Sequence, residues 1–551
     1  MVASSQPLAS QAGLAMLMAG GNAADAAVAM AAALAVTEPT STGIGGDCFA
    51  LHYEAATRQV TALNGSGRAP SALTIDRVRR DGLVDFSVPA VLTDPAVPAS
   101  PQFRDPVHAH TVTVPGACAA WCDLLARHGS LPWPAVLAPA IRLAQDGFPV
   151  APITACFWQR AADRLLTRAP GGLAMTIDGR GPRAGEAFRN PGLAATLRLV
   201  AEGGAEAFYR GPIAQAVAAA VQAAGGVLTA QDLAAHLSTW DTPISTVYRG
   251  VRVWECPPNG QGLAALLALN ILSGVNLAAM GPLDTPRWHW MVEAMRLAFA
   301  DSHWVVADPQ FSQAARPPGN PLAPAPLAAL LAPDYAAGRR RQIDPARAMA
   351  PPERGAPAVG SGTVYCCAVD GAGNACSLMN SNYMGFGTGI VPQGWGFTLQ
   401  NRGFGFSLDP DHPNALAPGK RPYHTIIPGL LTHAADDALL GPFGVMGGFM
   451  QPQGQMQVVV GMVDDGLDPQ AALDRLRFCI DRADGGGAVQ LEAGLPPELS
   501  AGLAALGHTV VPGVSGHARA LFGRGQIIRR DPGGVLWGGS DPRADGCAMG
   551  F

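Results

Sequence analysis

The sequence has few charged residues and lacks the usual cofactor motifs. Only 14% of its 551 residues are Asp, Glu, Lys or Arg, and a net charge of −5 gives no electrostatic case for nucleic-acid binding. The ten cysteines form no CxxC pair, and the twelve histidines show no zinc-ligand spacing. Neither a GxxxxGK[ST] phosphate loop nor a strand-turn-helix GxSxG elbow is found. We therefore expect no metal, no cofactor and no nucleic-acid partner.

The N-terminus lacks the basic region and leucine-rich core of a signal peptide. Its most apolar stretch, residues 23–36, is short and contains Asp25, so it does not predict a membrane span. Scattered cysteines in a chain of this size fit a reducing compartment. These features predict a cytoplasmic protein without a membrane partner; a periplasmic or secreted location stays open if a signal was removed.

Hydrophobic residues make up 48% of the chain, enough for a large core. The N-terminal part favours helices, and the chain after residue 363 favours strands. A Pro-rich stretch at about 308–362 between them is expected to wrap the surface. This order predicts a layered α/β fold. We expect helices near 117–127, 135–146, 190–202, 211–224, 261–273, 286–302, 453–465 and 468–476, and strands that include 111–115, 363–370, 375–381, 395–400, 426–432 and 525–529.

One junction in the sequence is unusual. Thr363 opens a β-branched, apolar run directly after Gly360-Ser361-Gly362. If the chain were cut before Thr363, that residue would carry both a hydroxyl nucleophile and an α-amino group, whose pKa near 7.7–8.0 suits a general base. Gly362 permits the backbone geometry that attack on its own carbonyl requires. The alternative is a linker that enters an ordinary edge strand.

Further motifs accompany this junction along the chain. They are Gly20–Ala29, Gly43–Asp47, Val114–Gly116, Tyr248–Gly250, Leu269–Leu272, Thr363–Asn374, Phe386–Val391, Pro418–Pro422, Gly447-Gly448 and Gly539–Arg543. In this order they resemble the motifs of the γ-glutamyltransferase (γ-glutamyltranspeptidase, glutathione hydrolase) family. The similarity runs through most of the chain, so no single short motif carries it.

The resemblance implies an N-terminal-nucleophile hydrolase with an αββα sandwich, made as a proenzyme that cuts itself between Gly362 and Thr363. The products would be a large chain, 1–362, and a small chain, 363–551, intertwined in one fold. Thr363 would be the nucleophile and would form an acyl-enzyme. The family implies three further roles. Ser381 would hydrogen-bond the nucleophile, Gly447 and Gly448 would form an oxyanion hole, and Arg68 would bind the substrate carboxylate. As alternatives, Ser381 is a plain strand serine, Gly447-Gly448 a tight turn and Arg68 a surface arginine.

The sequence departs from the family where the substrate ammonium is bound. Gly405 stands where an aspartate is expected, and Arg402 where Glu or Gln is usual. His424-Thr425 stands where the family has a pair of serines, so only one of the two hydroxyl groups, that of Thr425, is retained. An ammonium group in this place would lose its counter-charge and face an arginine. Arg402, His424 and Thr425 are therefore candidate substrate-binding residues together with Arg68.

Three hypotheses follow. The leading one is an amidohydrolase or acyltransferase that acts on γ-glutamyl amides such as glutathione, with water or an amine as acceptor. The second is a glutaryl or cephalosporin-type acylase on the same scaffold, in which a carboxylate-bearing acyl group has no free amine. The third is a binding relative that never matures and does not catalyse; intact Thr363, Ser381, Gly447 and Gly448 speak against it.

Overall fold

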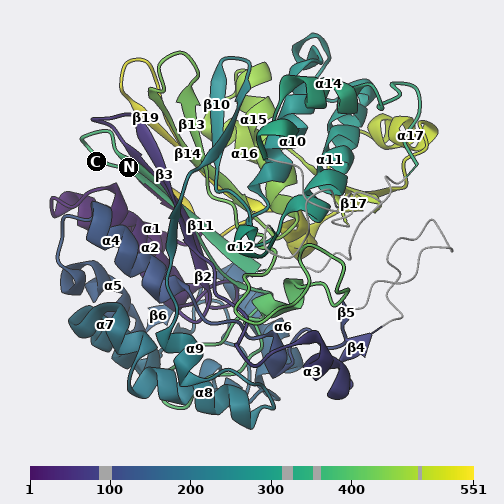
Figure 1. The fold of residues 1–551 in the computed structure, drawn as a ribbon. Helices are drawn as coiled ribbons and strands as arrows, with labels where there is room; N and C mark the ends of the chain where they lie inside the picture. The colour runs from purple at the N-terminus through teal and green to yellow at the C-terminus, as the bar shows by residue number, and fades with distance from the viewer. Residues whose placement is uncertain (86–101, 313–326, 351–361, 482–486) are drawn as a thin grey trace.

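Two antiparallel sheets stacked face to face form the centre of the molecule, and helices cover both outer faces (Figure 1). The computed structural model describes residues 1–85, 102–312, 327–350, 362–481 and 487–551. Gly360 and Ser361, which precede the junction at Thr363, and part of the Pro-rich stretch therefore lie outside the described residues. The arrangement is the αββα sandwich expected from the sequence.

The first sheet has seven strands and is built from distant parts of the chain. Residues after 362 supply two central strands, β11 and β12, which lie between strands from the beginning of the chain. β1 pairs with β11 on one side and with β20 on the other, so the two termini lie side by side (Figure 1). In sheet order the strands are β20 (Cys547–Met549), β1 (Val2–Ser4), β11 (Gly362–Val369), β12 (Ala375–Tyr383), β2 (Asp47–Glu54), β3 (Gln59–Gly65) and β8 (Thr239–Asp241).

The second sheet has six strands, and its β14 packs against β11 of the first. This contact places the start of β11 in the interior between the two sheets. In sheet order the strands are β19 (Leu536–Ser540), β18 (Arg524–Arg530), β14 (Leu439–Met446), β13 (Gly429–His433), β10 (Val251–Glu255) and β9 (Ile244–Tyr248). Smaller sheets join β15 (Phe478–Ile480), β16 (Val489–Glu492) and β17 (Val510–Val514), β4 (Val84–Asp85) with β5 (Gln102–Phe103), and β6 (Phe148–Pro149) with β7 (Ala187–Phe188).

The helix that lies directly on the first sheet is rich in alanine. All residues of α2 (Ala23–Thr37) are buried against β11 and β12 on one side and against α1 and α5 on the other. Small side chains let the helix axis approach the sheet closely, which explains the composition. Helices on this side are α1 (Pro7–Met18), α4 (Ala117–His128), α5 (Trp133–Asp146), α6 (Pro152–Ala161), α7 (Pro191–Tyr209), α8 (Pro212–Ala223) and α9 (Ala230–Ala234).

On the opposite side, α10 and α15 lie on the second sheet, and α11 packs on α10 (Figure 1). α10 is buried almost throughout, as its run of Leu and Ala predicts. Helices here are α10 (Gly262–Ser273), α11 (Thr285–Val305), α14 (Pro333–Arg340), α15 (Met450–Asp464), α16 (Pro469–Asp474) and α17 (Pro497–Ala505); short helices are α3 (Ile75–Arg80), α12 (Pro309–Ser312) and α13 (Leu327–Leu330). None of the helices in the described ranges combines the length and the apolar character needed to cross a bilayer.

The predicted helices correspond to observed ones, but two predicted strands are wrong. A strand over 111–115 was expected, but a 3₁₀ turn ends at residue 111 and residues 112–116 are irregular. Residues 395–400 are irregular, because their amides bond to separate segments, such as Gln400 N–H to the Gly45 carbonyl at 3.0 Å. Conversely, β14 was not predicted, since its sequence contains Gly and Pro, which are depleted in strands.

Candidate active site

Thr363 lies at the start of β11, where the strand pairing is irregular. Gly362 pairs with Tyr383 and Val364 with Asn380, so a β-bulge falls at the Gly362–Thr363 peptide. Thr363 is fully buried, and its hydroxyl donates to Ser381 Oγ at 3.2 Å. The bulge releases this peptide from the regular ladder and leaves the hydroxyl beside a second hydroxyl.

Ser381, near the end of β12, connects Thr363 to Arg402. Its Oγ accepts from the Tyr383 N–H at 2.9 Å and from Arg402 Nη2 at 3.2 Å. Tyr383 has a φ of 77°, in the left-handed region that a bulky residue rarely adopts. Arg402 Nη1 in turn donates to Thr425 Oγ1 at 2.8 Å. We call Thr363, Ser381, Arg402 and Thr425 the threonine cluster.

Arg402 is the charged member of the threonine cluster. It begins a 3₁₀ turn (Arg402–Gly405), is fully buried, and stacks its guanidinium over the Tyr383 ring with 4.1 Å between Cζ and the ring centroid. Among the described residues no carboxylate lies within ion-pair distance of Arg402, and its Nε has no hydrogen-bond partner. Burial lowers its pKa to about 10, against the opposing effects of Tyr383 and Asp47, so it stays charged at neutral pH.

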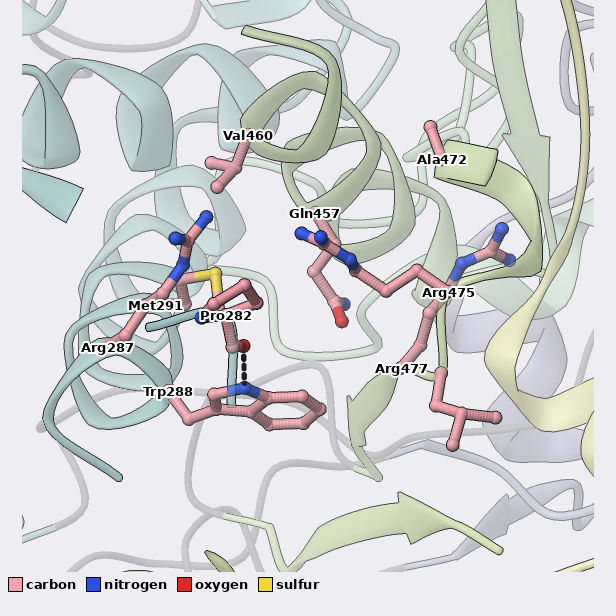
Figure 2. A pocket seen from close by; sticks show the side chains of 10 residues that line it. Pro282, Arg287, Trp288, Met291, Gln457, Val460, Ala472, Arg475 and Arg477 are labelled. Carbon is pink, nitrogen blue, oxygen red and sulfur yellow. Dashed lines mark hydrogen bonds between the residues drawn. The ribbon is translucent and has the colours of Figure 1, made fainter. Parts of the chain in front are cut away.

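The arginines that line a small pocket between α11, α15 and α16 differ from Arg402 (Figure 2). Arg287 makes a two-pronged ion pair with Asp465, which also binds Arg475. Arg477 pairs with Asp541 at 2.8 Å. Each of these three guanidinium groups thus has a carboxylate within the fold, whereas the described part of the chain supplies none to Arg402.

Gly447 and Gly448 lie between β14 and α15. Their φ angles of 139° and 62° are in the region that favours glycine. Neither amide donates to an acceptor among the described residues, although both carbonyls accept hydrogen bonds from the first turn of α15. Free amides at a helix start are suited to an oxyanion. The structure therefore leaves two candidate oxyanion donors unengaged.

Two glutamines that were not predicted from the sequence form hydrogen bonds to Thr363, Thr425 and Gly448. Gln451, in the first turn of α15, donates from Nε2 to Thr363 Oγ1 at 3.4 Å and accepts the Ile427 N–H. Gln261 donates from Nε2 to the carbonyls of Thr425 and Gly448, at 2.7 and 2.8 Å. The available signal was the run of glutamines that begins three residues after Gly448.

His424 and Asp47 form a buried pair next to the threonine cluster. His424 Nε2 lies 3.0 Å from Asp47 Oδ2, and its Nδ1 accepts the Ile426 N–H at 3.3 Å. Asp47 Oδ1 accepts from Gly67, Gly116 and Gln400. With both ring nitrogens occupied inside the protein, His424 has no free group to offer a substrate in this conformation.

Burial of neutral histidine predicts a loss of stability in acid. Burial, followed by the charge of Arg402, lowers the pKa of His424 to about 3, and burial likewise lowers that of His52 to about 3. In the unfolded chain these histidines have a pKa near 6.5, so below that pH they are protonated in the unfolded chain but stay neutral in the folded one. The free energy of unfolding therefore falls as the pH drops toward 3, by up to about 1.4 kcal/mol per pH unit per histidine. Urea midpoints at pH 7, 6, 5 and 4 measure this loss.

The matched control for this pH dependence is the exposed His517. A His517→Gln variant should follow the wild-type curve, whereas His424→Gln should flatten it. A wild-type midpoint that stays constant from pH 7 to pH 4 would contradict the prediction.

Arg68 lies outside the threonine cluster. Its Nη1 binds Asp308 Oδ2 at 3.3 Å and the Gly419 carbonyl at 3.1 Å, and its Nη2 donates to Gln310. About a quarter of the side chain is exposed. The structure thus brings Thr363, Ser381, Arg402 and Thr425 together and gives Arg68 and His424 protein partners.

A separate group of potential metal ligands lies between α11 and the residues before β17. His289, Glu293 and His508 are buried, with ligand atoms within 4.8 Å of one another. His289 Nδ1 lies 2.8 Å from His508 Nε2, and its Nε2 lies 2.8 Å from the Asp344 carbonyl. Sequence spacing does not reveal this group, because His508 is 219 residues from His289. Its hydrogen bonds tie residue 344 to α11.

Comparison with known proteins extends over the whole chain. The sequence profile of the family described as gamma-glutamyltranspeptidase matches residues 9–551. A glutathione hydrolase-like YwrD proenzyme from Bacillus subtilis is 36% identical over 553 residues, 100% of this chain and 98% of the relative. An oxamate amidohydrolase proenzyme from Klebsiella pneumoniae is 34% identical over 558 residues, 99% of this chain and 97% of the relative.

A solved structure shows the same extent of similarity. A cephalosporin acylase from Bacillus halodurans superposes with a TM-score of 0.88 at 46% identity, covering 100% of this chain and 96% of that one. These relatives are described as hydrolases or acylases, and their substrates differ.

Proposed function

The chain belongs to the γ-glutamyltranspeptidase family, as its motifs indicated, and on that premise we propose that it is a proenzyme whose nucleophile is Thr363. It is a hydrolase or acylase of the N-terminal-nucleophile type. The observation that carries the proposal is the buried Thr363 hydroxyl, placed at a β-bulge and bonded to Ser381 at 3.2 Å. The products of maturation are chains 1–362 and 363–551.

Maturation begins with attack of Thr363 Oγ1 on the Gly362 carbonyl carbon. The C–N bond breaks as the C–O bond forms, the hydroxyl proton passes to nitrogen, and an ester replaces the amide. Water then hydrolyses this ester and leaves a Gly362 carboxylate and a free Thr363 α-amino group. The bulge favours the first step, because this peptide is not held by a regular ladder on both sides.

In the mature enzyme the α-amino group of Thr363 accepts the hydroxyl proton while Oγ1 attacks the substrate amide. Ser381 orients the hydroxyl, and the amides of Gly447 and Gly448 stabilise the oxyanion. The protonated amine then donates to the leaving nitrogen, and an acyl-enzyme ester remains. Water, or an acceptor amine, resolves this ester and restores Thr363.

The proposed substrates are amides whose acyl group carries a carboxylate, and γ-glutamyl amides such as glutathione form one class of these. The carboxylate is attracted by the positive charge of Arg402, with Thr425 beside it and Arg68 further out. Because Arg68 is already bound to Asp308, a substrate carboxylate would compete for it.

A second candidate, a glutaryl-type acylase, is favoured by Gly405 and Arg402. A Cβ at Gly405 would lie 3.1 Å from the Tyr423 carbonyl, so this place holds no side chain that could offset a substrate ammonium. The nearest charged group along the turn is Arg402, which repels an ammonium. A glutaryl group has no α-amino group, so a glutaryl amide would not be repelled by Arg402.

Hydrolysis of paired chromogenic anilides tests both candidates. If the acylase candidate is right, kcat/KM for glutaryl p-nitroanilide should exceed that for γ-glutamyl p-nitroanilide by at least tenfold, about 1.4 kcal/mol of ammonium repulsion. Faster γ-glutamyl turnover would remove the acylase candidate and keep the γ-glutamyl one. No turnover of either anilide by the self-cleaved enzyme would refute both.

A matched pair of variants sharpens this comparison. Gly405→Asp should shift the preference toward the γ-glutamyl anilide, since it supplies a negative charge near the ammonium. Gly405→Ala meets the same contact with the Tyr423 carbonyl without the charge, and should leave the preference unchanged.

A further inference from the structure

The guanidinium of Arg402 lies close to the nucleophile. Two hydrogen bonds of 3.2 Å meet at Ser381 Oγ, one from Thr363 Oγ1 and one from Arg402 Nη2. The two outer atoms are therefore no further apart than twice 3.2 Å, about 6.4 Å. The backbone nitrogen of Thr363 is three bonds from Oγ1, so it too lies within reach of this charge.

The charge of Arg402 acts at nearly full strength on its surroundings. The side chain is completely buried, so bulk water does not screen it. The described residues offer it no carboxylate within ion-pair distance, and its hydrogen bonds go to hydroxyls, which carry no compensating charge. With a pKa of about 10, it remains a cation at neutral pH.

None of the other described groups around Thr363 forms an ion pair with Arg402. Burial raises the pKa of Tyr383 and lowers that of His424, so both are neutral at pH 7. Asp47 opposes the effect of burial on Arg402, but no ion pair joins the two side chains, and the Asp47 oxygens contact three N–H donors and His424. On the second sheet, Arg524 is paired with Glu38 at 3.0 Å. Arg402 is therefore the cationic side chain that shares a hydrogen-bond partner, Ser381, with the nucleophile.

We propose that Arg402 keeps the α-amino group of Thr363 unprotonated at neutral pH, so that it is ready to accept the hydroxyl proton. Two like charges close together in a poorly solvated interior repel each other, which disfavours the ammonium form. Relative to the ordinary value near 7.7–8.0, we expect the pKa of this amine to fall by about one unit or more. Arg402 is thus a positioning residue that acts on the base. This inference rests on the cleavage at Thr363 proposed above.

The first measurement needs no substrate and no variant. Cyanate carbamylates only the unprotonated amine, so the pH dependence of its reaction with the Thr363 amine of the mature enzyme, followed by mass spectrometry of the small chain, gives the pKa of that amine. We expect a midpoint at or below about pH 7. A midpoint at 8 or above overturns the proposal.

The second measurement assigns the shift to Arg402. Arg402→Gln removes the charge and should raise both the cyanate midpoint and the acid limb of kcat/KM by about one pH unit. Arg402→Lys keeps a charge and should move them by less than half as much. A midpoint that is unchanged in Arg402→Gln overturns the proposal, because burial alone would then explain a low pKa.

A matched control separates charge from packing. Thr425→Val removes the hydroxyl that binds Arg402 Nη1 at 2.8 Å but removes no charge, so the midpoint should stay near that of the wild type. If the small chain does not begin at Thr363, the proposed function fails. If it does begin there but the midpoints do not respond to Arg402, only the present inference fails.

Discussion

A Thr363→Ala variant is expected to remain a single chain of 56.6 kDa and to lose at least about 10⁴-fold of the amidase activity. The substitution removes the Oγ1 that we propose attacks Gly362 during maturation and the substrate amide afterwards. It therefore abolishes both steps, although the packing of β11 against β14 changes by little more than a hydroxyl and a methyl group. A denaturing gel and an anilide assay measure the two effects.

Wild-type protein and a Thr363→Ser variant provide the comparison. The wild type should give two bands, and sequencing of the small chain should begin Thr-Val-Tyr-Cys. Serine retains the hydroxyl, so this variant should still cut, at a lower rate. Cutting at the same bond in Thr363→Ala would refute the mechanism, and a wild type that stays whole would favour a binding protein that does not catalyse.

A Gly448→Ala variant is expected to lose about 10²- to 10³-fold in kcat. Gly448 has a φ of 62°, which alanine adopts only with strain, so the backbone there should shift and move the amide that we propose binds the oxyanion. The carbonyl of the same residue is held by Gln261 at 2.8 Å, so the shift should also reach Thr425. Steady-state kinetics on the mature variant measure the loss.

Gly466 is the matched control, because its φ of 65° is nearly the same and a Cβ there would meet nothing within 4 Å. Gly466→Ala should suffer a similar backbone strain, about 1 kcal/mol, with unchanged kcat. Equal kcat values for Gly448→Ala and Gly466→Ala would argue against an oxyanion role for Gly448.

Much of the fold was predictable because local composition and packing agree. The alanines of 23–37 predict a helix, and close packing on a sheet is where small side chains are favoured. The strand after Gly362 also follows from its β-branched and apolar residues. β14 was missed because Gly441 and Pro442 weaken the local signal, and its place is set by pairing with β13 and β18.

The site was predictable only in part, for a physical reason. Thr363, Ser381 and the two glycines stand in recognisable local patterns. By contrast, the partners of Arg68 and the contact of Gln451 with Thr363 join residues 240 and 88 positions apart, and these depend on how the layers pack. Among the described residues Arg402 has no carboxylate partner, and this likewise depends on how the whole interior packs rather than on any local pattern.

The position of β11 and β12 between β1 and β2 affects whether the mature enzyme can refold after it unfolds. Once the bond before Thr363 is cut, each central sheet is shared by two separate molecules. While folded, they are held by continuous strand pairing and should not separate under mild conditions. Once unfolded, they would have to meet again, so recovery becomes a bimolecular, concentration-dependent reaction. We expect the precursor to refold after denaturation far better than the processed protein, whose longevity then rests on slow unfolding.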